Sequence, residues 1–292
     1  MKEEGQKGIE KKVQIVDELF DERQTRSFKL ALHLGSEGLV AAVWDENVNR
    51  VLGLEYYEFY KTGQPASWLN RYETVLKESS FLHLSYKKVL VGIRDTKFTL
   101  VPNALYASDA TETYFKFNHT LLDTEHLHQD NLPNLDARLL YTCPTIIEKA
   151  IKQNHSPLSF HYASSAWIEY LLLTSRYVEG AKVAINIFPS HFEIAAILQG
   201  RLQLFNSFSI KNADDFIYYL MFCITQLGFN PEQLKLEIHG QISQESAMYQ
   251  LAKRYIRNVE WASRPDALTC GSQFANIPAH CHTEIFSQFL YN

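Results

Sequence analysis

The sequence predicts an α/β protein built from two related halves, each a mixed sheet with flanking helices. Residues 29–59 read as three apolar strands joined by tight turns, and residues 182–209 repeat that order. The offset between the two starts is 182 − 29 = 153 residues, close to half of the 292-residue chain. A repeat of this length indicates one structural unit used twice, so we predict an internal duplication. A ligand cleft between the halves is then expected.

The elements of the first half follow from residue spacing. Lys29, Ala31 and His33 alternate with leucines, and this period of two marks a strand. Turn residues at 35–38 and 45–47 separate the next two strands. Later segments read in order as a helix from residue 67, a strand at 88–93, a strand at 137–143, a helix at 145–154, a strand at 158–162 and a helix at 165–177.

In the second half the helix signals are clearer. Asn212 stands where an N-cap belongs, and Asp215 favours the positive end of a helix. Gly228 and Pro231 end that helix, because glycine adopts the left-handed conformation of helix ends and proline forbids continuation. A closing strand at 234–239 and a final helix at 245–257 are expected, and residues after 266 show no readable pattern.

These elements predict three segments. Residues 1–25 are expected to form a mobile leader, because charges run through them without sustained apolar periodicity. The first half should span 26–177 and the second half 178–292.

Composition excludes several classes of protein. The net charge of −5, with the two signs mixed along the chain, gives no basic field for nucleic acid. No apolar run approaches the roughly 20 residues that span a bilayer, so we expect no membrane insertion. The start has no signal-peptide core. The four scattered cysteines indicate reduced thiols, and we expect a cytoplasmic protein.

The order strand, tight turn, strand, strand, helix, strand, used twice, resembles the actin-like ATPase superfamily, whose halves are of the ribonuclease-H type. The resemblance covers residues 29–257 and is one of pattern more than of motif. The whole chain also resembles a bacterial family of unknown function that is described as having this fold.

The resemblance implies two phosphate-binding turns, each with an Asp that positions the metal, a Gly and a hydroxyl. The first turn keeps Gly35 and Ser36, but His33 stands where the Asp belongs. The second turn has Asn186 in place of the Asp, Phe188 in place of the Gly, and a proline after it. Proline has no N–H to offer a phosphate. The later nucleotide loop keeps one glycine, Gly240.

We therefore expect a vestigial nucleotide cleft lined by Gly35, Ser36, Asn186 and Gly240, with no catalytic residue, no metal site and no ATP–Mg²⁺ cofactor. Phe188 is hypothesised to close the gap between the halves by packing near Gly35 or Leu34 of the first half. The alternative is that its ring points into the core of its own half.

Two function hypotheses remain from different classes. The first is a non-catalytic binding or assembly module, a pseudoenzyme that binds an unknown protein partner. The second is a nucleotide-dependent ATPase or kinase that uses other metal-positioning residues, with Asp45, Asp95 and Asp109 as conceivable substitutes. The histidines at 119, 126 and 128 lack a zinc-ligand spacing and read as surface residues.

Overall fold

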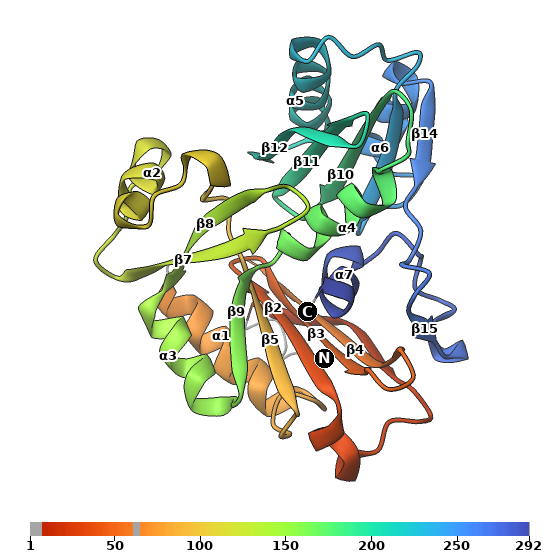
Figure 1. Ribbon diagram of the computed structural model, residues 1–292. Coiled ribbons are helices and arrows are strands. Elements are labelled where there is room, and N and C mark those ends of the chain that lie inside the picture. The colour runs from red at the N-terminus through yellow and green to blue at the C-terminus, as the bar shows by residue number, and fades with distance from the viewer. Residues whose placement is uncertain (1–7, 61–64, 292) are drawn as a thin grey trace. The chain divides into compact units, whose positions relative to one another are not determined.

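The computed structural model describes residues 8–60 and 65–291, and it is a mixed α/β structure (Figure 1). The chain forms two compact units. The first unit comprises Met1–Ala166, Ala267–Asn276 and Glu284–Asn292, and the second comprises Trp167–Asp266 and Ile277–Thr283. Short 3-10 helices lie at Glu22–Ser27, Asn103–Leu105, Ser108–Ala110 and Ser272–Phe274.

The main sheet of the first unit has the strand order β1-β4-β3-β2-β5-β9, and β15 also pairs with β4. Strands β1 to β4 pair antiparallel, whereas β5 lies parallel to β2 and β9 parallel to β5, which makes the sheet mixed. The strands are β1 (Ile9–Val16), β2 (Lys29–Gly35), β3 (Gly38–Asp45), β4 (Arg50–Phe59), β5 (Lys88–Arg94), β9 (Leu158–Tyr162) and β15 (Thr269–Cys270).

Helices cover both faces of this sheet (Figure 1). Helices α1 (Pro65–Glu78) and α3 (Thr145–Asn154) contact each other on one side. Helix α7 (Thr283–Tyr291) supplies Phe286 and Phe289 to the core on the other side, where they meet Ala31 and Val40. Residues separated by most of the chain therefore share one core.

A small three-stranded antiparallel sheet of order β6-β8-β7 also belongs to the first unit. Its strands are β6 (Phe98–Pro102), β7 (Glu125–Leu132) and β8 (Ala137–Pro144). Helix α2 (Thr111–Asn118) packs Phe115 onto Val101 and Leu140, which gives this sheet a core of its own.

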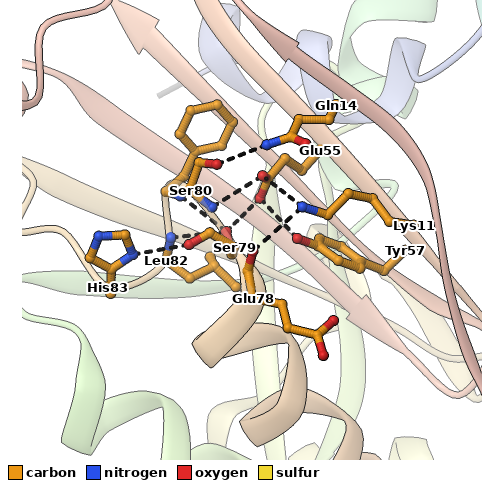
Figure 2. A network of polar contacts seen from close by, with 10 residues as sticks. Lys11, Gln14, Glu55, Tyr57, Glu78, Ser79, Ser80, Leu82 and His83 are labelled. Atoms are coloured by element: carbon orange, nitrogen blue, oxygen red, sulfur yellow. Dashed lines mark hydrogen bonds and ion pairs between the residues drawn. The ribbon is translucent and has the colours of Figure 1, made fainter. Parts of the chain in front are cut away.

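Glu55 is a fully buried carboxylate on β4, and a polar network surrounds it (Figure 2). Its Oε1 accepts a hydrogen bond from the Ser80 amide at 3.1 Å and lies 3.5 Å from Lys11 Nζ. Its Oε2 accepts from Ser79 Oγ, which in turn accepts the amides of Phe81 and Leu82 at 3.1 Å each. The network fixes the loop that follows α1, since every group named has a partner.

The second unit is built on one five-stranded sheet of order β12-β11-β10-β13-β14. Its first three strands pair antiparallel, and β13 and β14 add parallel to β10. The strands are β10 (Ala181–Ile187), β11 (His191–Leu198), β12 (Arg201–Ser209), β13 (Lys235–Gly240) and β14 (Asn258–Trp261).

Helices α5 (Ala213–Gln226) and α6 (Ala247–Tyr255) bury Phe216, Leu220 and Ala252 in the core of the second unit. The Asn212 side chain accepts the Asp215 amide at 2.9 Å, so the predicted N-cap of α5 is present. On the other face of the sheet, Trp167 of α4 (Ser165–Ser175) contacts the rings of Phe205 and His239.

Apart from β1 and β15, the two main sheets share one strand order, with three antiparallel strands followed by parallel additions next to the first of them. The α/β fold class is confirmed, and descent from an internal duplication stays a prediction.

The structure differs from the expected segments in two places. Strand β1 (Ile9–Val16) lies in the stretch expected to be a mobile leader, since its half-buried residues alternate with exposed ones and pair with β4. Residues 1–7 of that stretch lie outside the described residues. The second unit begins at Trp167, whereas the second half was expected from residue 178. Helix α7 belongs to the first unit from Glu284 onward, because its phenylalanines pack there.

Candidate functional site

The first candidate turn joins β2 to β3 in the first unit. Gly35 pairs with Gly38, so Ser36 and Glu37 form a two-residue hairpin loop. A Cβ on Gly35 would lie 2.8 Å from the Arg94 carbonyl oxygen, so the chain needs glycine here for close backbone packing. The Ser36 carbonyl accepts a hydrogen bond from Arg71 at 3.4 Å.

His33, where the resemblance implies a metal-positioning carboxylate, is completely buried. Its Nε2 lies 2.6 Å from Gln288 Oε1 on α7, and because that oxygen can only accept, Nε2 carries the proton. Burial, with a contribution from the charge of Arg94, lowers the pKa of His33 to about 4. The ring is therefore neutral at pH 7 and carries no negative charge for a cation.

Two residues of β5 lie near His33. Gly92 on β5 lies beside the ring, and a Cβ there would lie 2.4 Å from His33 Cδ2. Arg94, two residues further along β5, forms a buried ion pair of 2.9 Å with Glu284 on α7. Helix α7 thus contacts the end of the first unit's central strands through one hydrogen bond and one ion pair.

The second candidate position, Asn186, lies on β10 in the second unit. Its register partners are Glu193 on β11 and His239 on β13, and all three side chains are buried. Neither Asn186 Oδ1 nor Nδ2 has a hydrogen-bond partner among the described residues. A buried amide without partners lowers the free energy of unfolding by about 1–3 kcal/mol, so Asn186 makes the fold less stable.

The turn after Asn186 is filled by aromatic rings. The Phe188 amide donates to the His191 carbonyl at 2.9 Å, which closes the turn on itself. The Phe188 ring stacks on the His191 ring with centroids 4.5 Å apart and an interplanar angle of 12°. That Phe188 also packs near Gly35 stays a prediction.

Gly240 ends β13 with a φ of +102°, and a Cβ there would lie 2.2 Å from the Ile187 carbonyl oxygen. Only glycine fits this conformation and this approach. Its N–H donates to the His280 carbonyl at 2.9 Å, so this amide is already used inside the second unit.

His239, the neighbour of Gly240, is held by a polar network. Its Nε2 donates to Glu237 Oε1 at 2.7 Å, and its Nδ1 accepts from Thr283 Oγ1 at 2.7 Å and Trp167 Nε1 at 3.4 Å. Burial alone raises the pKa of Glu237, but the His239 hydrogen bond and the Lys182 charge outweigh it and lower that pKa to about 2. With every ring nitrogen engaged, His239 serves the structure of the second unit.

The structure thus places Gly35 and Ser36 in the first unit and brings Asn186 and Gly240 together on adjacent strands of the second. That the four residues line one nucleotide cleft stays a prediction. Gln288 and Glu284 were not predicted from the sequence, because they come from the segment after residue 266. The apolar spacing of Ile285, Phe286 and Phe289 was the signal of a helix there.

The three conceivable substitute carboxylates have local surroundings. Asp45 accepts the Asn47 amide at 2.9 Å, and Asp95 accepts the Lys97 amide at 3.1 Å, so both order turns. Burial raises the pKa of Asp95, which favours its neutral form. Asp109 lies in a short 3-10 helix.

Metal-ligand groups and membrane-spanning helices are both absent from the described residues. Within residues 8–60 and 65–291, no three His, Cys, Asp or Glu side chains are grouped so that they could hold a metal ion. In the same part of the chain, no helix has the length and apolar character needed to cross a membrane.

Comparison with known proteins identifies the fold. The sequence profile of a family described as "Protein of unknown function (DUF3822)" matches residues 17–259. A Bacteroides thetaiotaomicron protein with an actin-like ATPase fold and unknown function superposes with a TM-score of 0.79 at 21% identity, over 93% of this chain and 99% of that one. A chain of the PilM–PilN type IV pilus biogenesis complex gives a TM-score of 0.60 at 10% identity, over 91% of this chain and 98% of that one. No curated protein matches the sequence. The fold is therefore that of the actin-like ATPases.

Proposed function

The chain belongs to the DUF3822 family, and we propose that it is a non-catalytic binding or assembly module with an actin-like ATPase fold. The observation that carries this proposal is the environment of His33. A neutral, fully buried imidazole bonded to Gln288 stands where the resemblance places a metal-positioning carboxylate. Mg²⁺ prefers carboxylate and phosphate oxygens, and this ring offers neither.

The other positions of the expected nucleotide site do not fit an ATP–Mg²⁺ group either. Asn186 supplies a neutral amide in place of the second carboxylate. The Gly240 N–H is bonded to a carbonyl, and the Phe188 N–H closes its own turn. Phosphate-binding turns need several free N–H groups that point at the ligand. The residues present therefore support a pseudo-ATPase.

A protein partner in the bacterial cytoplasm fits this interpretation. The chain offers no basic field to nucleic acid, since its net charge is −5. The PilM–PilN complex, a structural neighbour, shows the same fold within an assembly of two proteins. The partner of this chain would be found by co-purification under native conditions.

Calorimetric titration of the full chain with ATP and Mg²⁺ tests the proposal, together with a turnover assay. We expect no hydrolysis and no binding in the low micromolar range. The variant Phe188→Gly should lower the melting temperature, because it removes the stack on His191, and should not restore binding. Low-micromolar binding that Ser36→Ala weakens and Asp45→Ala leaves intact would overturn the proposal in favour of a nucleotide-dependent enzyme.

A further inference from the structure

Strand β12 (Arg201–Ser209) is an outer strand of the second unit's sheet, and among the described residues it pairs only with β11. From residue 202 to 210 it carries no charged side chain. The register shift at Gln203 leaves a regular stretch, 204–209, paired one to one with β11. Strand β1, an edge of the other sheet, instead carries Glu10, Lys11 and Lys12. Charges of this kind protect edges from pairing, and β12 lacks them after its first residue, Arg201.

Backbone groups of β12 are bonded to the strand's own side chains. The Ser207 amide donates to Asn206 Oδ1 at 2.8 Å, and the Arg201 carbonyl accepts from Gln203 Nε2 at 3.1 Å. Both of these side chains are exposed. An incoming strand can replace such local bonds with a full ladder, because side-chain amides give way at little cost.

An apolar strip on α5 flanks the same edge. Tyr218 and Phe222, one helical turn apart, are 64% and 49% exposed, and their rings stack at 6.3 Å. The neighbouring Tyr219 stacks on Phe208 of β12 with centroids 4.8 Å apart. The strip and the edge therefore form one continuous surface, with a strand to pair and aromatic rings beside it.

We propose that this surface, β12 together with Tyr218 and Phe222, binds a second copy of the chain as an isologous dimer. The two β12 strands pair antiparallel with Asn206 on the two-fold axis. In that register Phe205 of one copy exchanges backbone hydrogen bonds with Ser207 of the other, and Leu204 lies opposite Phe208. The two α5 helices then cover the new strand pair from the same side, ring against ring.

Charge complementarity favours a second copy over another occupant. Arg201 begins β12, and the acidic first turn of α5, Asp214 and Asp215, follows shortly after the other end of the strand. An antiparallel pair brings Arg201 of each copy to that acidic turn of its mate. In this register Arg201 lies opposite Lys211 of its mate. The Lys211 backbone amide is bonded to the Asp215 carboxylate, so that carboxylate lies at the same place, and together with Asp214 it gives this end a net charge of −1 against the +1 of Arg201.

This inference rests on the proposed function as an assembly module and names the partner. The two can fail separately. A dimer that binds ATP with low-micromolar affinity would overturn the proposed function and leave the dimer standing. A monomer that binds no ATP would overturn the dimer and leave the proposed function standing.

The test is the oligomeric state of the full chain, measured by analytical ultracentrifugation over a range of concentrations. We expect the wild type at twice the monomer mass. Asn206→Lys places two ammonium groups at the axis, and Phe222→Glu places a carboxylate in the apolar strip, so each should weaken dimerisation by roughly 100-fold. The matched control is Tyr255→Glu on α6, where the ring is also 49% exposed. It should leave the dimer unchanged.

A covalent readout checks the register. Asn206→Cys should form a disulfide between copies under mild oxidation, because the two side chains meet at the axis, while Tyr255→Cys should not. Circular dichroism confirms that each variant is folded, and Phe222→Glu keeps the test open if a β12 variant fails to fold. A monomeric wild type, growth into open filaments, or a dimer that neither Asn206→Lys nor Phe222→Glu weakens overturns the proposal.

Discussion

His33 Nε2 and Gln288 Oε1 lie 2.6 Å apart although 255 residues separate them in the sequence. Both side chains are buried, and the strand that carries one is covered by the helix that carries the other. The contact joins strand β2 to helix α7 within the first unit. We propose that this position, where the resemblance to the actin-like ATPases places a carboxylate for a cation, serves packing in this chain.

Gly92→Ala should lower the free energy of unfolding by about 1–3 kcal/mol, because the new Cβ overlaps the His33 ring. In the background His33→Ala the same change should cost clearly less, since the ring is gone. Urea unfolding of the four variants of this double-mutant cycle measures the coupling. An equal loss in both backgrounds would show that Gly92 serves something other than His33.

Acidification should destabilise the protein partly through His33. Its folded pKa, about 4, lies below the ordinary value of 6.5. Between these two pH values the unfolded chain therefore binds a proton that the folded chain does not bind. The contribution of the neutral His33 ring to the free energy of unfolding is fully present above pH 6.5 and is lost as pH falls from 6.5 toward 4. We expect His33→Gln to reduce the drop in unfolding free energy over this range by up to about 3 kcal/mol.

Urea titrations at several pH values between 7 and 4 make that measurement. Burial lowers the pKa of His155 to about 4 as well, so part of the drop should remain in His33→Gln and become smaller still when His155 is also replaced. The lowered pKa of His280 contributes to what then remains. A slope that His33→Gln leaves unchanged contradicts the assignment.

Asn186→Leu should raise the unfolding free energy by about 1–3 kcal/mol, because it removes a buried amide that has no hydrogen-bond partner among the described residues. Asn212→Leu is the matched control, since that amide caps α5, and its loss should cost about 1 kcal/mol. Thermal unfolding compares the two. Destabilisation by Asn186→Leu would mean that this amide binds something the fold needs.

Ser79→Ala should destabilise the first unit by about 2–3 kcal/mol, because it strips one hydrogen bond from Glu55 and leaves the amides of Phe81 and Leu82 without their acceptor. The control Ser209→Ala changes an exposed serine on β12 and should stay within about 0.5 kcal/mol of the wild type. Chemical denaturation decides the comparison, and equal stabilities would show that the network in Figure 2 contributes little.

Much of the fold was predictable because local spacing controls it. The alternation in β2 and β10, the glycines of the first hairpin and the cap of α5 each act within a few residues. Strand β1 was missed because Lys11 interrupts the half-buried series of Ile9, Val13 and Ile15, and further charges lie on the exposed side. Its position in the sheet depends on pairing with β4, and no local sequence pattern predicts that pairing.

The candidate site was predictable only in part. The sequence shows that His33 and Asn186 are not carboxylates. It does not show that Gln288 accepts a hydrogen bond from the ring, because that contact is made by a distant helix. Gly92 offered a weak signal, since a glycine inside an apolar strand often marks the close approach of another group.

The chain leaves the first unit at Ala166, builds most of the second, passes through the first again at Ala267–Asn276, and returns to it with α7 from Glu284. On the ribosome, His33 is therefore among the early residues made, while Gln288 and Glu284 emerge after the whole second unit has been translated. Domains usually fold in the order in which they are synthesised. We therefore expect the core of the first unit to be completed only after the second unit has been synthesised. A chain halted after Asn276 should expose β2 to β5 to chaperones and proteases. In limited proteolysis, that fragment should be cleaved before residue 166 more rapidly than the full chain.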